Sequence, residues 1–197
     1  MQTQAATLRV AVLPRAGVGT DILLVGGGTA LVSLAAQLSI HLGFTPVPLT
    51  GQTFAVLLVA AALGTVRGTA SLLLYLLIGA AGAPVYAEHK HGWEVFSGAT
   101  GGYIVGFVVA AALVGYLAER GWDRRFSTAV SVMLTGNVII YACGLTWLHH
   151  SLGVSWAKAL EYGLYPFVPG DIFKLYLAAL ALPGAWKLVE RVKRTDS

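Results

Sequence analysis

The chain has 197 residues, of which 11% are Asp, Glu, Lys or Arg and 56% are hydrophobic, and its mean hydropathy is +0.72. A typical soluble domain carries about 25% charged residues, so this composition excludes an ordinary soluble globule. It also excludes intrinsic disorder, which needs low hydrophobicity and high charge. The sequence predicts a polytopic membrane protein, whose net charge of +4 indicates contact with the cytoplasmic leaflet and not with nucleic acid.

The few charged residues are separated by long apolar stretches. Residues 22–66, 68–87, 95–118 and 126–157 contain no Asp, Glu, Lys or Arg. A transmembrane helix needs roughly 20 apolar residues, so these stretches are long enough to cross a bilayer. In chain order the hydrophobic segments predict six spans, at about 22–42, 54–66, 69–85, 99–118, 127–148 and 167–189.

The segments between these spans are short. The first of them, GFTPVPLTGQT at residues 43–53, is rich in Gly and Pro, which predicts a non-helical loop. No connection is long enough for a second domain. We therefore expect a cytoplasmic N-terminal segment over residues 1–21, one membrane domain over 22–189 and a cytoplasmic tail over 190–197.

The distribution of Lys and Arg predicts the orientation of the spans. With both termini inside, ten of the thirteen cations flank the cytoplasmic ends of the spans, and only Lys90 and Lys158 lie outside. Such an excess is what the positive-inside rule requires. The remaining cation, Lys174, falls within the sixth span. The expected fold class is an all-α integral protein of the cell (plasma) membrane, with six transmembrane helices and both termini cytoplasmic.

Common catalytic and nucleotide-binding motifs are absent from the sequence. There is no GxxxxGK[ST] and no HExxH, so the chain itself provides no energy source for uphill transport. Cys143 is the only cysteine, which excludes an intramolecular disulfide and a cysteine-based metal site. His89 and His91 flank a lysine in a polar loop, where solvated side chains are a simpler interpretation than a metal site.

The strongest local signal is the segment Pro169–Lys174, at the outer end of the sixth span. An ionisable side chain within a span costs roughly 2.5–3.5 kcal/mol at its centre by insertion scales. Asp171 and Lys174 are three residues apart, so they share one helix face and can point into one polar cavity. The structural alternative is that Asp171 stabilises the helix N-terminus and that Lys174 pairs with it or extends towards the interface.

Three further positions carry polar groups that the span pattern does not require. The loop with Thr50, Gly51 and Gln52 offers hydrogen bonds as a lid over a ligand, or it merely connects two helices. Tyr103 follows Gly102 in a stripe of small residues that allows close helix packing. Asn137, in the fifth span, suits either a ligand contact or an interhelical hydrogen bond.

The first span carries small residues with a four-residue spacing. The pairs are Gly26 with Ala30 and Thr29 with Ser33. Small residues at this spacing let two helix backbones approach closely. This face is therefore suited either to internal packing or to docking of a partner helix.

Five blocks of sequence occur here in a characteristic order. They are PVPLTGQT, GAAGAPVYA, GATGGYIVGF, GNVIIYACGLTWL and PFVPGDIFK, within roughly residues 22–185. In these blocks the chain resembles BioY, the biotin-specific substrate-binding (S) component of energy-coupling factor (ECF) transporters. The resemblance implies a six-helix membrane protein, without enzymatic activity or cofactor, that captures biotin from the outside at high affinity. It also implies that a separate transmembrane T component and ATPase subunits complete the transporter.

The resemblance also assigns candidate roles to individual residues. Asp171 and Lys174 match the family's GDxxK pair; a buried carboxylate can accept hydrogen bonds from the ureido ring, and an ammonium can donate to the ureido carbonyl or to the carboxylate tail. In this family an Ala-xxx-Ala face on the first span commonly docks the T component, and Gly26/Ala30 and Thr29/Ser33 approximate it. The other ligand contacts are expected from Thr50, Gly51, Gln52, Tyr103, Asn137, Tyr86 and Trp93.

Other functions remain open at this point. The same architecture with another vitamin as ligand is the nearest alternative, and a panel of labelled vitamins separates the two. A membrane-embedded enzyme that uses Asp171 and Lys174 as acid and base is a different class, but the sequence offers it no third catalytic partner. A structural scaffold, in which the glycine stripes serve only assembly, predicts that this pair tolerates replacement by Asn and Gln.

Overall fold

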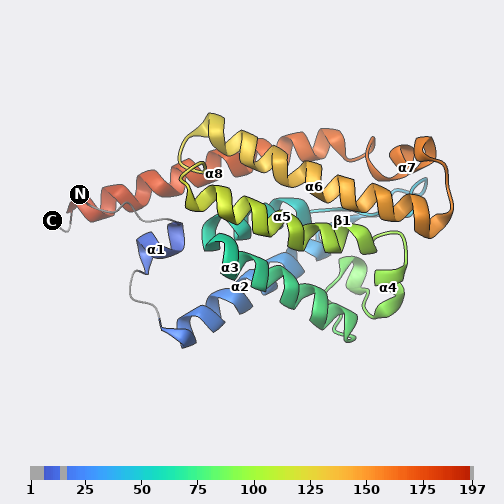
Figure 1. The fold of residues 1–197 in the computed structure, drawn as a ribbon, viewed down its shortest axis with the longest axis horizontal. Coiled ribbons are helices and arrows are strands. Elements are labelled where there is room, and N and C mark those ends of the chain that lie inside the picture. The colour runs from blue at the N-terminus through green and yellow to red at the C-terminus, as the bar shows by residue number, and fades with distance from the viewer. Residues whose placement is uncertain (1–6, 14–16, 196–197) are drawn as a thin grey trace.

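Long helices packed side by side make up most of the fold (Figure 1). The computed structural model describes residues 7–13 and 17–195. Within them, five helices are long and apolar enough to cross a membrane: α2, α3, α5, α6 and α8. The elements in chain order are α1 (Leu8–Val12), α2 (Val18–Gln37), β1 (Ser39–Ile40), β2 (Leu49–Thr50), α3 (Gln52–Ala80), the 3₁₀ turn η1 (Ala87–His89), α4 (Trp93–Ser97), α5 (Gly101–Glu119), α6 (Phe126–Leu152), α7 (Trp156–Gly163) and α8 (Val168–Thr195).

The predicted spans 54–66 and 69–85 lie in one element, α3, which reverses direction at Gly64. That residue has φ 81° and ψ −176° inside an otherwise helical stretch. A Cβ on Gly68 would lie 2.9 Å from the Cα of Ala60, and Gln52 Nε2 donates to Tyr75 Oη over 2.7 Å. Residues so far apart along a straight helix could not touch, so the two arms of α3 run antiparallel. The reversal was predicted at residues 67–68 and occurs three residues earlier, because Gly64 adopts a backbone conformation that other residues disfavour.

The helices alternate between two ends of the bundle. Figure 1 shows α1 and the C-terminal part of α8 together at one end, with α4 and α7 at the opposite end. We call the first the terminal end. It also holds the loop 120–125 and Gly64, and Gly64 lies close to Thr7 and Glu119. We call the other the loop end; it holds the polypeptide between α2 and α3.

An ionic clamp fastens the terminal end of α2. The carboxylate of Asp21, in the first turn of α2, accepts hydrogen bonds from Arg9 of α1 over 2.7 Å and from Arg67 of α3, where both contacts also measure 2.7 Å. The Arg9 side chain is only 8% exposed. A buried guanidinium needs such a partner, so this carboxylate ties α1, α2 and the second arm of α3 together.

The loop end contains more secondary structure than the sequence predicts. Ser39 and Ile40 pair antiparallel with Thr50 and Leu49, so the predicted Pro-rich loop begins and ends in a short two-stranded ladder. The polar segments 86–98 and 149–165 contain η1, α4 and α7. In α7 the Ser155 side chain caps the helix by accepting from Lys158 N–H.

Small residues set the closest helix contacts. A Cβ on Gly115 would lie 2.5 Å from the backbone nitrogen of Thr65, and a Cβ on Gly106 would lie 3.1 Å from the Cα of Ile140. Gly102 likewise faces Cys143 and Trp147 of α6. The small-residue stripe of α5 therefore packs internally, as its spacing predicts.

The Gly64→Ala substitution is expected to destabilise the fold. An alanine there would be held at positive φ, and its Cβ would lie 2.5 Å from Glu119 Oε1 and 3.0 Å from Thr7 Cγ2. Backbone strain of this kind costs about 1–3 kcal/mol. The thermal midpoint of the detergent-solubilised protein is therefore expected to fall.

Gly184→Ala provides the matched control, since Gly184 lies within α8 and nothing is within 4 Å of an added Cβ. Helix propensity favours alanine there by up to about 1 kcal/mol, so the midpoint is expected to stay or rise. An equal response of the two variants would contradict the reversal at Gly64.

Candidate functional site

The first turns of α8 place Asp171 and Lys174 on one face. The carboxylate of Asp171 lies near the N-terminus of α8, where the helix dipole favours a negative charge; the residue is only 6% exposed. Lys174 Nζ lies 2.9 Å from Asp171 Oδ1. The sequence prediction that both point into the same polar environment agrees with this geometry.

The Asp171 carboxylate is a junction between three helices. Its Oδ1 accepts hydrogen bonds from Lys174 Nζ and, over 3.1 Å, from Thr53 Oγ1 of α3. Its Oδ2 accepts a hydrogen bond from the Tyr141 hydroxyl of α6. A buried carboxylate is costly unless it is paired and hydrogen-bonded, and within the described part of the chain its donors are the side chains of Thr53, Tyr141 and Lys174.

Lys174 connects the junction to the Pro-rich loop. Besides Asp171, its ammonium donates to the backbone oxygen of Thr50 over 2.6 Å and to Thr53 Oγ1 over 3.3 Å. These three acceptors match the three donors of an ammonium group. The end of β2 is therefore held against α8 by a charge-assisted hydrogen bond.

A second polar group comes from the start of α3. Gln52 Nε2 donates to Tyr75 Oη over 2.7 Å, and Gln52 Oε1 accepts from Thr50 Oγ1 over 3.1 Å. The Tyr75 ring meets the Tyr86 ring edge-on, with centroids 5.4 Å apart. The Gln52 amide is thereby fixed in one orientation between the end of β2 and the second arm of α3.

Tyr86 closes the site on the side of the 86–98 segment. Its hydroxyl donates to Leu76 O over 2.7 Å, and a Cβ on Gly79 would fall 2.3 Å from its ring, so the glycine makes room for the tyrosine. The residue is 1% exposed, and this burial raises the pKa of the Tyr86 hydroxyl to about 12. Tyr86 is therefore a neutral aromatic surface at physiological pH.

Tyr103 and Tyr141 form the opposite aromatic side. Their rings meet edge-on, with centroids 6.3 Å apart. The Tyr103 hydroxyl donates to Gly163 O over 2.9 Å, and a Cβ on Gly144 would lie 2.3 Å from the Tyr103 ring. Tyr103 thus bridges α5, α6 and the end of α7.

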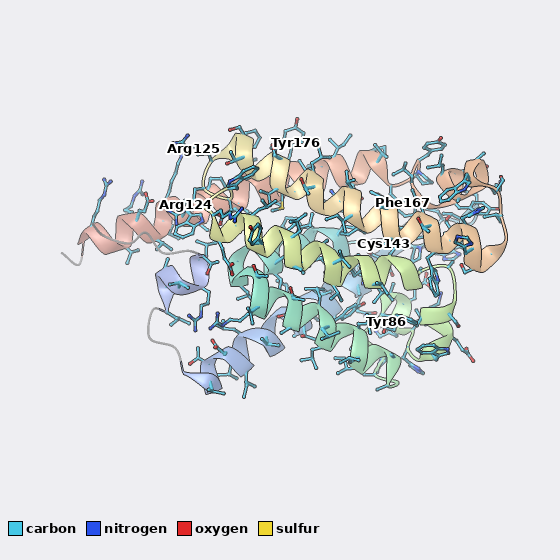
Figure 2. All side chains as sticks on the ribbon, viewed as in Figure 1. Tyr86, Arg124, Arg125, Cys143, Phe167 and Tyr176 are labelled. Atoms are coloured by element: carbon cyan, nitrogen blue, oxygen red, sulfur yellow. The ribbon has the colours of Figure 1, made fainter. Side chains whose placement is uncertain are left out.

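These groups enclose a cavity of about 540 Å³. Its size is typical of small-molecule sites, which measure about 300–1,000 Å³ and combine apolar surface with a few placed polar groups. Figure 2 places Tyr86 and Phe167, two lining residues, in the half of the bundle near the loop end. Lys90, His91 and Glu94 also line the cavity.

Six of the predicted ligand contacts lie together around this cavity. They are Thr50, Gln52, Tyr86, Tyr103, Asp171 and Lys174.

Three other predicted contacts do not line the cavity. Trp93 is 68% exposed and its ring lies 5.0 Å from that of Phe96, measured between centroids. Asn137 is buried in α6, and its Oδ1 has no hydrogen-bond partner among the described residues. Gly51 uses its backbone N–H to bond Leu38 O over 3.0 Å.

Of the lining residues that were not among the predicted ligand contacts, three bond through a hydroxyl group to residues that were: Thr53, Tyr75 and Tyr141. The sequence offers two interpretations of Thr53, as a hydrogen-bonding group of a lid over a ligand or as the N-cap of its helix; α3 begins at Gln52, and the Thr53 hydroxyl binds Asp171. Tyr141 lies in the apolar stretch 126–157, where its position alone does not distinguish it from a packing residue.

The predicted docking face of α2 divides into a packed side and an exposed side. Thr29 is 4% exposed and donates to Ser71 O over 2.9 Å, so it packs internally against α3. Ser33 bonds back to Thr29 O over 2.8 Å. Gly26 has nothing within 4 Å of an added Cβ, and Ala30 is exposed. Only the Gly26/Ala30 pair is therefore open to a partner helix.

Comparison with known proteins agrees with this architecture. The model of the BioY family matches residues 3–191. The protein "Biotin transporter BioY" of Thermotoga maritima is 41% identical over 163 residues, covering 81% of this chain and 92% of the relative. "Biotin transporter BioY" of Rhizobium etli is 36% identical over 157 residues, covering 76% of this chain and 83% of the relative.

A solved structure has the same fold. The crystal structure of the S-component for biotin from an ECF-type ABC transporter aligns with a TM-score of 0.76 and 25% identity, over 86% of this chain and 92% of that chain. A match of the family model to nearly the whole sequence, together with these relatives, shows that the chain belongs to the BioY family.

Proposed function

We propose that this protein is the biotin-capturing S component of a vitamin uptake transporter. The observation that carries the proposal is the buried Asp171 carboxylate beside a cavity of about 540 Å³. Biotin offers a neutral ureido ring with two N–H donors, an apolar bicyclic body and a carboxylate tail. Each part has a counterpart among the lining residues.

The ureido ring is proposed to bind at the Asp171 junction. Thr53 and Tyr141 donate hydroxyl hydrogens to this carboxylate, and both hydroxyls can rotate towards another acceptor. A ureido N–H can therefore replace a hydroxyl donor without leaving the carboxylate unpaired. The ureido carbonyl is proposed to accept from Lys174 or from the Gln52 amide.

The body and tail of biotin are proposed to extend towards the loop end. The rings of Tyr86, Tyr103 and Phe107 provide the apolar lining. Lys90, which forms a 2.6 Å ion pair with Glu88 and is 54% exposed, lies at the cavity as a cation for the carboxylate tail. The hydrogen bond from Lys90 lowers the pKa of Glu88.

We further propose six membrane crossings with both termini in the cytoplasm. The antiparallel arms of α3 support a separate crossing for each arm. Arg9, Arg67 and the loop 120–125 give the terminal end a marked excess of cations, which by the positive-inside rule indicates the cytoplasmic side. The cavity at the loop end then faces outwards. A T component, met by the Gly26/Ala30 face, and ATPase subunits are proposed to drive the inward step at the cell membrane.

The purified protein is expected to bind biotin, and to bind it more tightly than other vitamins. Equilibrium titration with labelled biotin, thiamine, riboflavin and folate measures this directly. Absence of biotin binding, or tighter binding of another vitamin, would refute the proposed ligand.

Asp171→Asn is expected to weaken biotin binding about 10- to 100-fold. A hydrogen bond to a charged group contributes about 1.5–3 kcal/mol, and each 1.4 kcal/mol is tenfold in Kd. Tyr141→Phe removes only one neutral donor to that carboxylate and is expected to cost less. The comparison uses the Kd of each variant, with the thermal midpoint as a check on folding. An Asp171→Asn protein that folds and keeps the wild-type Kd would contradict the assigned role.

Trp93→Ala and Asn137→Leu are expected to leave the Kd for biotin within about twofold. Neither side chain lines the cavity, and substitutions away from specific interactions usually change free energies by no more than about 0.5 kcal/mol. The same titration provides the measurement. A large loss of biotin affinity in either variant would show that the substituted side chain contributes to the ligand site.

A further inference from the structure

A second cavity lies at the terminal end, outside the ligand site. Its volume is about 450 Å³, and its lining includes Glu119, Arg120, Trp122, Arg124, Arg125 and Thr128. We call it the arginine pocket. Figure 2 shows Arg124 and Arg125 in the half of the bundle away from Tyr86 and Phe167. Nothing in the proposed capture of biotin uses these residues.

The backbone of the arginine pocket has a defined conformation. At the end of α5, Gly121 N–H donates to Ala118 O over 2.8 Å and Trp122 N–H donates to Leu117 O over 3.3 Å. With Gly121 at φ 82°, this pair of bonds is the Schellman motif that ends many helices. Arg124 N–H then donates to Gly121 O over 3.3 Å, and α6 begins at Phe126. The three arginines are therefore carried by a short, hydrogen-bonded turn.

Aromatic rings orient two of the guanidinium groups. The Arg120 guanidinium lies 3.9 Å from the centroid of the Tyr116 ring, and that of Arg124 lies 4.3 Å from the Trp186 ring. Such stacking holds a guanidinium in place. The Arg120 cation is thus positioned before any ligand arrives.

Near the arginine pocket, the carboxylates of Glu119 and Asp123 accept hydrogen bonds from Thr65 and Trp186, and Asp123 also interacts electrostatically with Arg124. Glu119 accepts from the backbone N–H of Thr65 over 2.8 Å and from its hydroxyl over 2.9 Å. Asp123 is fully buried and accepts from the Trp186 indole over 2.7 Å, and burial raises its pKa. Among the described residues, neither Arg120 nor Arg125 forms an ion pair with a carboxylate. The pocket therefore has an excess of positive charge.

We propose that the arginine pocket binds the phosphate group of an anionic phospholipid. Arginine presents a planar fork of donors that matches phosphate oxygens. Trp122, which is 46% exposed, is of the residue type found at membrane interfaces, where a lipid headgroup would meet the loop. Basic pockets between transmembrane helices on the cytoplasmic side commonly bind anionic headgroups. This inference rests on the proposed function in one respect only, which is that the terminal end lies at the membrane surface.

The test uses the purified full chain in nanodiscs of phosphatidylcholine alone or with added phosphatidylglycerol. A ligand that binds only the folded state stabilises it, so the thermal midpoint is expected to be higher with phosphatidylglycerol. The double variant Arg120→Gln/Arg125→Gln is expected to lose most of that rise. Its Kd for biotin is expected to stay unchanged, because neither residue lines the ligand cavity; this readout also separates a failure of the lipid site from a failure of the proposed function.

Lys187→Gln/Arg191→Gln is the matched control, since it removes two cations from α8 outside the arginine pocket. If the pocket is the site, this variant keeps the rise in midpoint. An equal loss in both double variants would overturn the proposal in favour of a general surface-charge effect, and no rise in the wild type would also overturn it. Inorganic phosphate added to phosphatidylcholine nanodiscs tests the source of the anion: a rise equal to that with phosphatidylglycerol would assign the pocket to free phosphate instead of a lipid.

Discussion

The buried carboxylate of Asp171 imposes the strongest constraint on this structure. An ionised group in an apolar bundle must be satisfied by donors, and here the donors come from α3, α6 and α8. The three helices must therefore meet at one point. A cavity forms beside that point because the donors are hydroxyl and ammonium groups on flexible or rotatable bonds, and not close-packed apolar side chains.

The two ends of the bundle use charge differently. At the terminal end, Asp21 joins Arg9 and Arg67, and both carboxylates of the α5–α6 region are committed to nearby donors. These contacts fasten helices to one another. At the loop end, the Asp171–Lys174 pair faces a cavity. The same chemistry thus stabilises the fold at one end and remains accessible to a small molecule at the other.

The sequence predicts most of the helices because their apolar stretches are long and their charges are few. It places the reversal of α3 at residues 67–68, because Arg67 is the charged residue between two apolar stretches. The composition does not indicate that Gly64 has a positive φ. The sequence misses α4, α7 and the short β1–β2 ladder, because brief polar elements depend on capping and tertiary contacts.

For the site, the sequence identifies Asp171 and Lys174 as the charges that stand out within an apolar segment. It does not identify Tyr75 or Tyr141, because hydroxyl-bearing residues are common in membrane helices. Thr53 and Asp171 are 118 residues apart along the chain. Only the fold brings them within hydrogen-bonding distance.

The tight reversal at Gly64 limits how the protein can move. The two arms of α3 are joined through a single non-helical residue and are hydrogen-bonded to each other through Gln52 and Tyr75, so both contacts oppose sliding of one arm past the other. One side of the cavity is therefore fixed. The Pro-rich loop beside it is held at three places: by the contact between Lys174 and the Thr50 carbonyl, by the β1–β2 ladder and by the hydrogen bond from Thr45 Oγ1 to Tyr162 O.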